Sequence, residues 1–177
     1  TVTEPEYQLP VASFTATPVL GSTPLVVMLD GSASTPTGGM LSSYSWSSTG
    51  GHNTTGATSN MTFEAAGDYI ITLTVGDSRQ ATNSNTTNIT VVEPLAASFT
   101  VTPPTGAAPL TVEVDASGSM HGIGSIIGYN WELSDGQTGS GITHDFTLPS
   151  GENTITLTVT SSNGDTSTSI NEVVVSA

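Results

Sequence analysis

One pattern of segments occurs twice in this chain, about 85 residues apart, and this repeat constrains the fold more than any single residue does. The matched segments keep their order and a nearly constant spacing from one copy to the next. The repeat predicts that one folding unit has been used twice. The matched pairs are Ala12–Pro18 with Ala97–Pro103, Thr23–Val27 with Ala108–Val112, Tyr44–Trp46 with Tyr129–Trp131, and Ile70–Val75 with Thr154–Val159.

The repeat divides the 177 residues into two domains. We expect an N-terminal strand or linker over residues 1–10, a first domain over residues 11–93 and a second domain over residues 94–177. Domains of this size can fold around a small hydrophobic core of their own. The chain has no cysteine, so each core must form without a disulfide or a cysteine-bound metal.

Alternation of apolar and polar residues dominates both copies. In Tyr69–Val75 and Ile155–Val159 every second residue is apolar and the others are mainly threonine, which predicts half-buried strands. Proline, glycine, asparagine and serine interrupt these runs every 8 to 12 residues or so, and no segment shows a sustained helical period. The pattern predicts an all-β fold of two tandem immunoglobulin-like β-sandwiches, with about seven strands each and almost no helix.

The charge balance excludes several classes of partner. Fifteen acidic residues face a single basic residue, Arg79, for a formal net charge of −14. A chain that cannot neutralise phosphates gains little from binding nucleic acid or an anionic membrane surface. We predict neither nucleic acid binding nor membrane insertion. The surface must be covered largely by serine, threonine, asparagine and glycine, a coat that favours an extracellular or cell-surface location.

The first residues resemble the boundary between the two copies. Thr1–Pro5 is similar to Thr90–Pro94, so we interpret Thr1–Thr3 as the last strand of a preceding copy or as a strand that pairs with another partner. The sequence starts at Thr1 rather than at methionine, which indicates a processed protein or an excised piece. Tyr7 lies outside both copies and is a candidate for a contact between domains or subunits.

Several motifs together resemble the PKD domain family. The second copy contributes Trp131–Gly136 (WELSDG), which is close to the Trp-x-Phe-Gly-Asp-Gly run of that family. The resemblance covers nearly all of residues 11–177. It implies tandem β-sandwiches of the kind that sit, without a catalytic role, in secreted proteases, chitinases, collagenases and large surface proteins. The motifs of the first copy are Phe14, Thr23–Val27, Asp30–Ser34, Tyr44–Trp46 and Gly67–Val75.

Some positions depart from the family pattern. The Asp-Gly turn of the family is Gly50–Gly51 in the first copy, and the tyrosine position is Asn153 in the second. Family members that bind calcium often carry extra carboxylates after the serine-rich loop, where this chain has Thr35–Gly39 and Met120–Gly124. The resemblance therefore implies the β-sandwich fold more firmly than it implies calcium binding.

A calcium ion requires about six to eight oxygen ligands, with two or more carboxylates among them. Asp30 and Asp77 are the candidate ligands in the first copy, whereas in the second copy Asp115 would face Ser161. We predict no cofactor-binding residue and no metal ligand, and we keep calcium in the first domain as the weaker alternative.

The aromatic residues allow two interpretations. Trp46 and Trp131 each lie two residues after a tyrosine on a strand, which favours a core tryptophan over an exposed platform for sugar or collagen. Tyr69 is likewise expected to pack against the sandwich and to form an internal hydrogen bond.

No catalytic motif is present. His52, His121 and His144 lack the spacing of a zinc site, and we expect them to be solvated. There is no Gly-x-Ser-x-Gly elbow and no lysine, so we predict that the chain is not an enzyme and has no catalytic residue. Four Asn-x-Ser/Thr sequons all fall in the first copy, at Asn53, Asn60, Asn85 and Asn88.

These observations favour a non-catalytic, extracellular structural, spacer or adhesion module of a larger secreted hydrolase or cell-surface protein. Its partners would be other domains of that protein, neighbouring subunits or an extracellular polymer. One alternative is a subunit of a filament or surface layer that assembles through its N-terminal strand. The other is a polysaccharide- or collagen-binding accessory module of a secreted enzyme.

Overall fold

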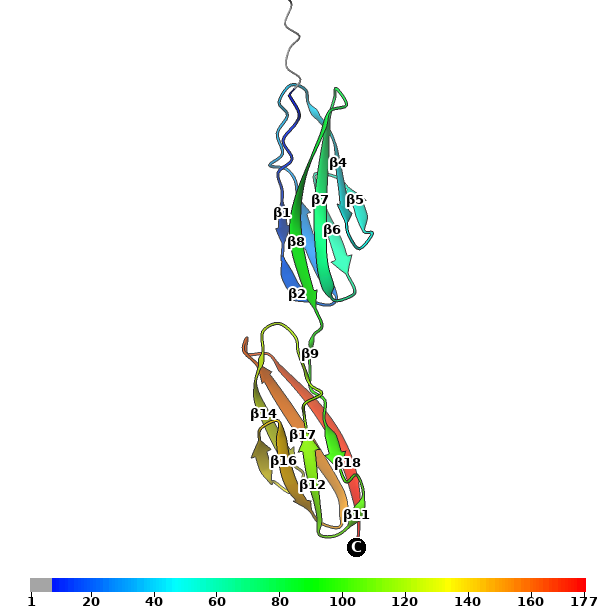
Figure 1. The fold of residues 1–177 in the computed structure, drawn as a ribbon, viewed down its shortest axis with the longest axis vertical. Coiled ribbons are helices and arrows are strands. Elements are labelled where there is room, and N and C mark those ends of the chain that lie inside the picture. Colours follow the sequence, from blue (N-terminus) through cyan, green and yellow to red (C-terminus); the bar gives the residue numbers. More distant parts are fainter. Residues whose placement is uncertain (1–7) are drawn as a thin grey trace, which may run out of the picture. The chain divides into compact units, whose positions relative to one another are not determined.

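The computed structural model describes residues 8–177 and divides into two compact units. The first domain ends at Val92, and the second runs from Glu93 to Ala177. Each domain is a sandwich of a three-stranded and a five-stranded sheet (Figure 1). The described residues form strands and turns but no helix, so the predicted all-β fold of two tandem sandwiches is confirmed.

The first domain contains eight strands within residues 8–92. In order they are β1 (Thr15–Thr17), β2 (Leu20–Ser22), β3 (Leu25–Asp30), β4 (Leu41–Ser48), β5 (Asn53–Thr55), β6 (Thr58–Phe63), β7 (Gly67–Asp77) and β8 (Thr82–Val92).

The second domain repeats these eight strands and adds a short antiparallel pair formed by β9 and β13. In order its strands are β9 (Leu95–Ala96), β10 (Thr100–Thr102), β11 (Gly106–Ala107), β12 (Leu110–Asp115), β13 (Met120–His121), β14 (Ile126–Leu133), β15 (Thr138–Ser140), β16 (Thr143–Leu148), β17 (Gly151–Ser161) and β18 (Thr166–Ser176).

The two domains share one sheet topology. The order is β1-β3-β6 and β2-β8-β7-β4-β5 in the first domain, and β10-β12-β16 and β11-β18-β17-β14-β15 in the second. The opening strand is divided in both domains, because its first part pairs with the small sheet and its second part pairs with the large one. This division, together with the short strands β5 and β15, brings the count above the seven strands expected for each domain.

The second part of the opening strand runs parallel to the last strand of its domain. In the first domain β2 pairs with β8, with Leu20 opposite Thr90 and Ser22 opposite Val92. In the second domain β11 pairs with β18 in the same way. All other strand pairs are antiparallel.

The cores follow directly from the period-two alternation of the sequence. Ile71, Leu73 and Val75 alternate with threonines along β7, and all three apolar side chains are 0% exposed. Their counterparts Ile155, Leu157 and Val159 on β17 are also 0% exposed. The alternate threonines face the outer side of the large sheet and are only half-buried. Removing these apolar faces from water is the main stabilising contribution to each sandwich.

Candidate functional site

Both tryptophans lie in the hydrophobic cores. Trp46 is 0% exposed and Trp131 is 2% exposed, so the predicted core position is confirmed and neither ring can stack on a polymer. Each indole Nε1 donates a hydrogen bond of 2.8 Å to a backbone carbonyl, Gly56 in the first domain and Gly141 in the second. A phenylalanine ring meets each indole edge-on at 5.1 Å between centroids.

The tyrosine position at the start of β7 and β17 is filled differently in the two domains. Tyr69 donates a hydrogen bond of 2.9 Å from its hydroxyl to the carbonyl of Ala65, as expected from the sequence. Asn153 is 2% exposed and donates from Nδ2 to the carbonyl of Pro149 at 3.0 Å. In both cases the accepting carbonyl lies four residues earlier, so the amide replaces the phenol as the donor that fixes the turn.

Two of the three histidines are packed rather than solvated, which corrects the expectation from the sequence. His52 is half-buried and its ring lies 4.8 Å from that of Phe63 and 6.2 Å from that of Tyr69. His144 is half-buried and lies 4.8 Å from Phe146. A search for metal-ligand spacing does not detect these contacts, because their partners are aromatic rings and not metal ligands.

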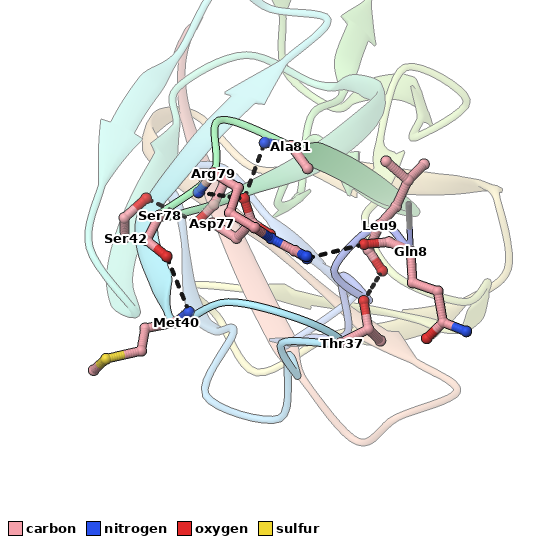
Figure 2. A network of polar contacts seen from close by, with 10 residues as sticks. Gln8, Leu9, Thr37, Met40, Ser42, Asp77, Ser78, Arg79 and Ala81 are labelled. Atoms are coloured by element: carbon pink, nitrogen blue, oxygen red, sulfur yellow. Dashed lines mark hydrogen bonds and ion pairs between the residues drawn. The ribbon is translucent and has the colours of Figure 1, made fainter. Parts of the chain in front are cut away.

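The most highly bonded polar group of the first domain is Asp77, at the turn between β7 and β8 (Figure 2). It is 3% exposed and is the one charged residue that lies buried within residues 8–177. Its Oδ1 accepts hydrogen bonds of 2.9 Å from the backbone N–H groups of Arg79 and Ala81. Its Oδ2 accepts from Nε and Nη2 of Arg79 at 3.2 and 3.1 Å.

These contacts determine the ionisation of Asp77. Burial by itself raises the pKa of the carboxyl. The hydrogen bonds from the Ala81 and Arg79 N–H groups, with the hydrogen bond and charge of the guanidinium, lower the pKa by more, so it lies below its usual value. The buried carboxylate is therefore ionised at neutral pH, and its partner is the only basic side chain in the sequence.

Arg79 also contacts the segment that leads into the first domain. Its Nη2 donates to the carbonyl of Gln8 at 3.3 Å, and the Thr37 hydroxyl donates to the carbonyl of Leu9. Figure 2 shows the guanidinium reaching from Asp77 to Gln8. A side chain at Gly38 would collide with that guanidinium. We call this arrangement of Gln8, Thr37, Gly38, Asp77 and Arg79 the Arg79 latch.

The second domain caps the same turn with a neutral side chain. Ser161, at the position of Asp77, is 1% exposed, and its hydroxyl accepts hydrogen bonds from the N–H groups of Asn163 at 3.3 Å and Asp165 at 3.1 Å. Asn163, at the position of Arg79, donates from Nδ2 to the carbonyl of Ile123 at 3.2 Å. In the first domain, Asp77 and Arg79 are two residues apart in the sequence and follow a long predicted strand. This spacing is the signal that could have identified the ion pair.

The donors around Asp77 do not fit a calcium site. Both of its oxygens already accept hydrogen bonds from the chain, and a cation would have to displace the guanidinium. Asp30 accepts from the Ser32 N–H at 2.9 Å, and hydrogen bonds from Ser32 lower its pKa. No group of three or more histidine, aspartate or glutamate side chains gathers within residues 8–177. Calcium in the first domain stays an untested alternative, to be checked by calorimetric titration.

A surface depression of the second domain, about 680 Å³ and open to solvent, lies against β14, β15 and β17. It is polar, and its lining residues include one carboxylate, Glu132, and His144. No exposed aromatic ring lines it. Its other lining residues are Asn130, Trp131, Thr138, Gly139, Ser140, Thr156 and Thr158.

The candidate residues at the extreme N-terminus, Thr1–Thr3 and Tyr7, lie outside the described residues. Across residues 8–177 there is no helix of the length and apolarity needed to cross a membrane.

Two β-sandwiches with one topology, each with a core tryptophan and a capped β7–β8-type turn, define an immunoglobulin-like tandem module. A profile of the PKD domain matches residues 7–91 and again residues 92–175, and the chain belongs to the PKD domain family.

Solved structures of PKD domains are similar to parts of the chain. The PKD1 domain from the Vibrio cholerae metalloprotease PrtV is 30% identical over 48% of this chain and 98% of that one, with a TM-score of 0.43. The PKD1 domain of Vibrio anguillarum Epp is 31% identical over 50% of this chain and 100% of that one, with a TM-score of 0.44. Fibronectin(III)-like modules of Clostridium thermocellum CbhA are 17% identical over 93% and 94%, with a TM-score of 0.41. No curated protein matches the chain.

Proposed function

We propose that the chain is a non-catalytic extracellular spacer module of a larger secreted or cell-surface protein. This proposal rests on one observation: the tryptophans and the buried aspartate of the chain serve its own fold. Both tryptophans are buried in the cores, and the buried carboxylate of Asp77 stabilises a turn, so these side chains are not available to a ligand. The large flat faces present mainly hydroxyl groups, which suit a hydrated surface outside the cell better than a catalytic cleft.

The pairing of the terminal strands suits a module that transmits tension. In the first domain β2 and β8 are parallel neighbours, and Figure 1 shows the chain entering this domain at the end opposite to the one where β8 leaves. A pull on the two ends therefore drives β2 and β8 in opposite directions along one axis. Several bonds would have to break together, including those from Thr23 N to Val92 O at 3.0 Å and from Thr90 N to Val19 O at 2.9 Å.

Single-molecule pulling on the chain tests this role. We expect two abrupt unfolding events, each releasing about 300 Å of chain, since about 85 residues per domain extend by at most ~3.6 Å each. Gradual lengthening at low force would contradict a tension-bearing spacer. Turnover of protein or polysaccharide substrates by the purified chain would contradict the non-catalytic assignment.

Polymer binding is the second candidate, and the polar depression around Glu132 is the feature that favours it. Hydroxyl, amide and carboxylate groups converge there and could hydrogen-bond a sugar chain. The matched residue in the first domain is Ser47. Replacement Glu132→Ser should abolish retention on insoluble chitin, cellulose or collagen if this candidate is correct, whereas Ser47→Ala should leave retention unchanged. Absence of retention by the unaltered chain would dismiss it.

Assembly through a donated N-terminal strand concerns residues that the structure does not describe, and it stays a prediction. Light scattering of the chain with and without residues 1–10 tests it. Assembly that disappears with those residues would support a filament or surface-layer subunit, and a monomer in both cases would oppose it.

A further inference from the structure

The two domains differ in the chemistry of their exposed strand faces. All four Asn-x-Ser/Thr sequons lie in the first domain, and residues 93–177 contain none. Acidic residues are distributed in the opposite sense, with four in residues 8–92 and nine in residues 93–177. The first domain therefore has less charge to keep its surface hydrated.

Asn60 lies on the outer face of the small sheet, directly opposite an exposed apolar side chain. It is exposed on β6 and pairs across the sheet with Met28 on β3, which is 65% exposed. Side chains in directly opposed positions stand about 5 Å apart. An open depression of about 450 Å³ is lined by both residues. The Asn60 amide makes no hydrogen bond to the part of the chain that the structure describes.

Asn88 repeats this arrangement on the large sheet. It is exposed on β8 and lies opposite Ile70 on β7, which is 45% exposed. Both residues line an open depression of about 510 Å³. Within the described residues the Asn88 amide also has no hydrogen-bond partner. Two sequons on different sheets thus each have a free amide next to an exposed apolar side chain.

The second domain has a carboxylate in place of each of these two sequon asparagines. The positions of Met28 and Asn60 are taken by Glu113 and Asp145, which lie opposite each other. The positions of Ile70 and Asn88 are taken by Thr154 and Glu172. A single exposed methionine or isoleucine is ordinary on a protein surface. Its pairing with a sequon occurs at two sites, and each sequon asparagine has a carboxylate at its position in the other domain, which points to a common reason.

The remaining two sequons lack this arrangement. The Asn85 amide donates to the carbonyl of Ala12 at 3.3 Å, and the Asn53 amide donates to the carbonyl of Gly51 at 3.0 Å. Both amides already donate a hydrogen bond within the first domain, unlike those of Asn60 and Asn88.

We propose that Asn60 and Asn88 are N-glycosylated and that the first sugar of each glycan covers Met28 and Ile70. The donor would be an oligosaccharide carried on a polyprenyl phosphate or diphosphate. Nδ2 of the asparagine forms a bond to C1 of the first sugar, and the bond from C1 to the phosphate oxygen breaks. The lipid phosphate leaves with the bonding electrons, and one amide proton passes to a base of the transferase. The glycans hydrate the first domain as carboxylates hydrate the second.

Mass analysis of the chain from the organism that encodes it, or from a secreting host with N-glycosylation, tests the proposal. We expect an intact mass above that of the polypeptide by whole sugar residues, with peptide sequencing placing them on Asn60 and Asn88. Thr62→Ala should remove the glycan at Asn60 and Thr90→Ala the glycan at Asn88. The matched variant Thr62→Ser retains the sequon and should retain the glycan.

The proposal rests on the extracellular location proposed above, and the experiment separates the two. Secreted chain with unmodified Asn60 and Asn88 would overturn the glycosylation and leave the location intact. Chain that stays inside its native cells would overturn the location, and with it the modification. Glycans on Asn53 or Asn85 alone would contradict the pairing with Met28 and Ile70.

Discussion

The two domains use the same core and fix their turns with different chemistry. Trp46 and Trp131 are both buried, and each has an edge-on phenylalanine neighbour and a 2.8 Å hydrogen bond to a glycine carbonyl. At the turns, by contrast, Tyr69 is exchanged for Asn153 and Asp77 for Ser161. The comparison teaches that such a sandwich requires a given hydrogen bond at each turn and accepts several side chains that supply it.

The largest effect is expected from the residues that the domains share. Trp46→Ala and Trp131→Ala should each lower the free energy of unfolding of their own domain by about 3–5 kcal/mol, because a large buried ring is removed. Urea denaturation followed by circular dichroism measures both losses, and the fluorescence of the remaining tryptophan, which lies in the other domain, identifies the transition of the unaltered domain. Similar losses would confirm that the cores are equivalent, and tolerance of either substitution would break the comparison.

The second comparison concerns the donors at the start of β7 and β17. Asn153→Ala should cost about 1–3 kcal/mol, because it removes a buried amide that donates hydrogen bonds to the carbonyls of Pro149 and Gly151. Tyr69→Phe should cost about 0.5–1.5 kcal/mol, because only one exposed hydrogen bond is lost. Denaturation midpoints of the two variants decide the order. A larger loss of unfolding free energy for Tyr69→Phe would show that the Asn153 amide does not stabilise its turn more than the Tyr69 hydroxyl does.

Acid should affect the two β7–β8-type turns differently. The pKa of Asp77 is lower in the folded chain than its unfolded value of about 3.9. Its stabilising contribution is therefore complete above about pH 4 and is lost as the pH falls through the folded value. Asp77→Ser, which installs the residue of the second domain, should flatten the pH dependence of the first domain in that acidic range.

Denaturation midpoints at pH 7 and at progressively lower pH measure this difference. Asp30→Ser in the same domain is the comparison variant. Hydrogen bonds from Ser32 also lower the pKa of Asp30, but its side chain is exposed, so this variant should flatten the pH dependence less than Asp77→Ser does. If Asp77→Ser leaves the pH dependence unchanged, the ion pair between Asp77 and Arg79 does not stabilise the turn.

The smallest effect is expected one residue beyond the ion pair. Gln80 has a φ of +69°, and the matched residue Gly164 has a φ of +88°. Gln80→Gly should stabilise the first domain by less than about 1 kcal/mol, because relief of the left-handed conformation is partly offset by the flexibility of glycine in the unfolded chain. Gly164→Ala should destabilise the second domain by about 1 kcal/mol. Thermal denaturation of both variants checks the opposite signs.

The repeat, the all-β sandwich and the core tryptophans could be predicted because each depends on a local sequence pattern. Alternation along Tyr69–Val75 specifies which face is buried, and Tyr-x-Trp places the indole on that face. The division of the opening strand between two sheets could not be predicted, since it depends on which neighbour β2 meets. The packing of His52 on Phe63 and the contact of Arg79 with Gln8 join residues that are distant in sequence and carry no local pattern.

The Arg79 latch makes local opening of the β7–β8 turn measurable by proteolysis. Trypsin cleaves after lysine and arginine, and this chain offers it one bond, between Arg79 and Gln80. That bond lies in the turn that Asp77 caps, so the protease must wait for the turn to detach. The rate of cleavage into two fragments therefore reports how often this single turn unlocks while the rest of the sandwich remains folded.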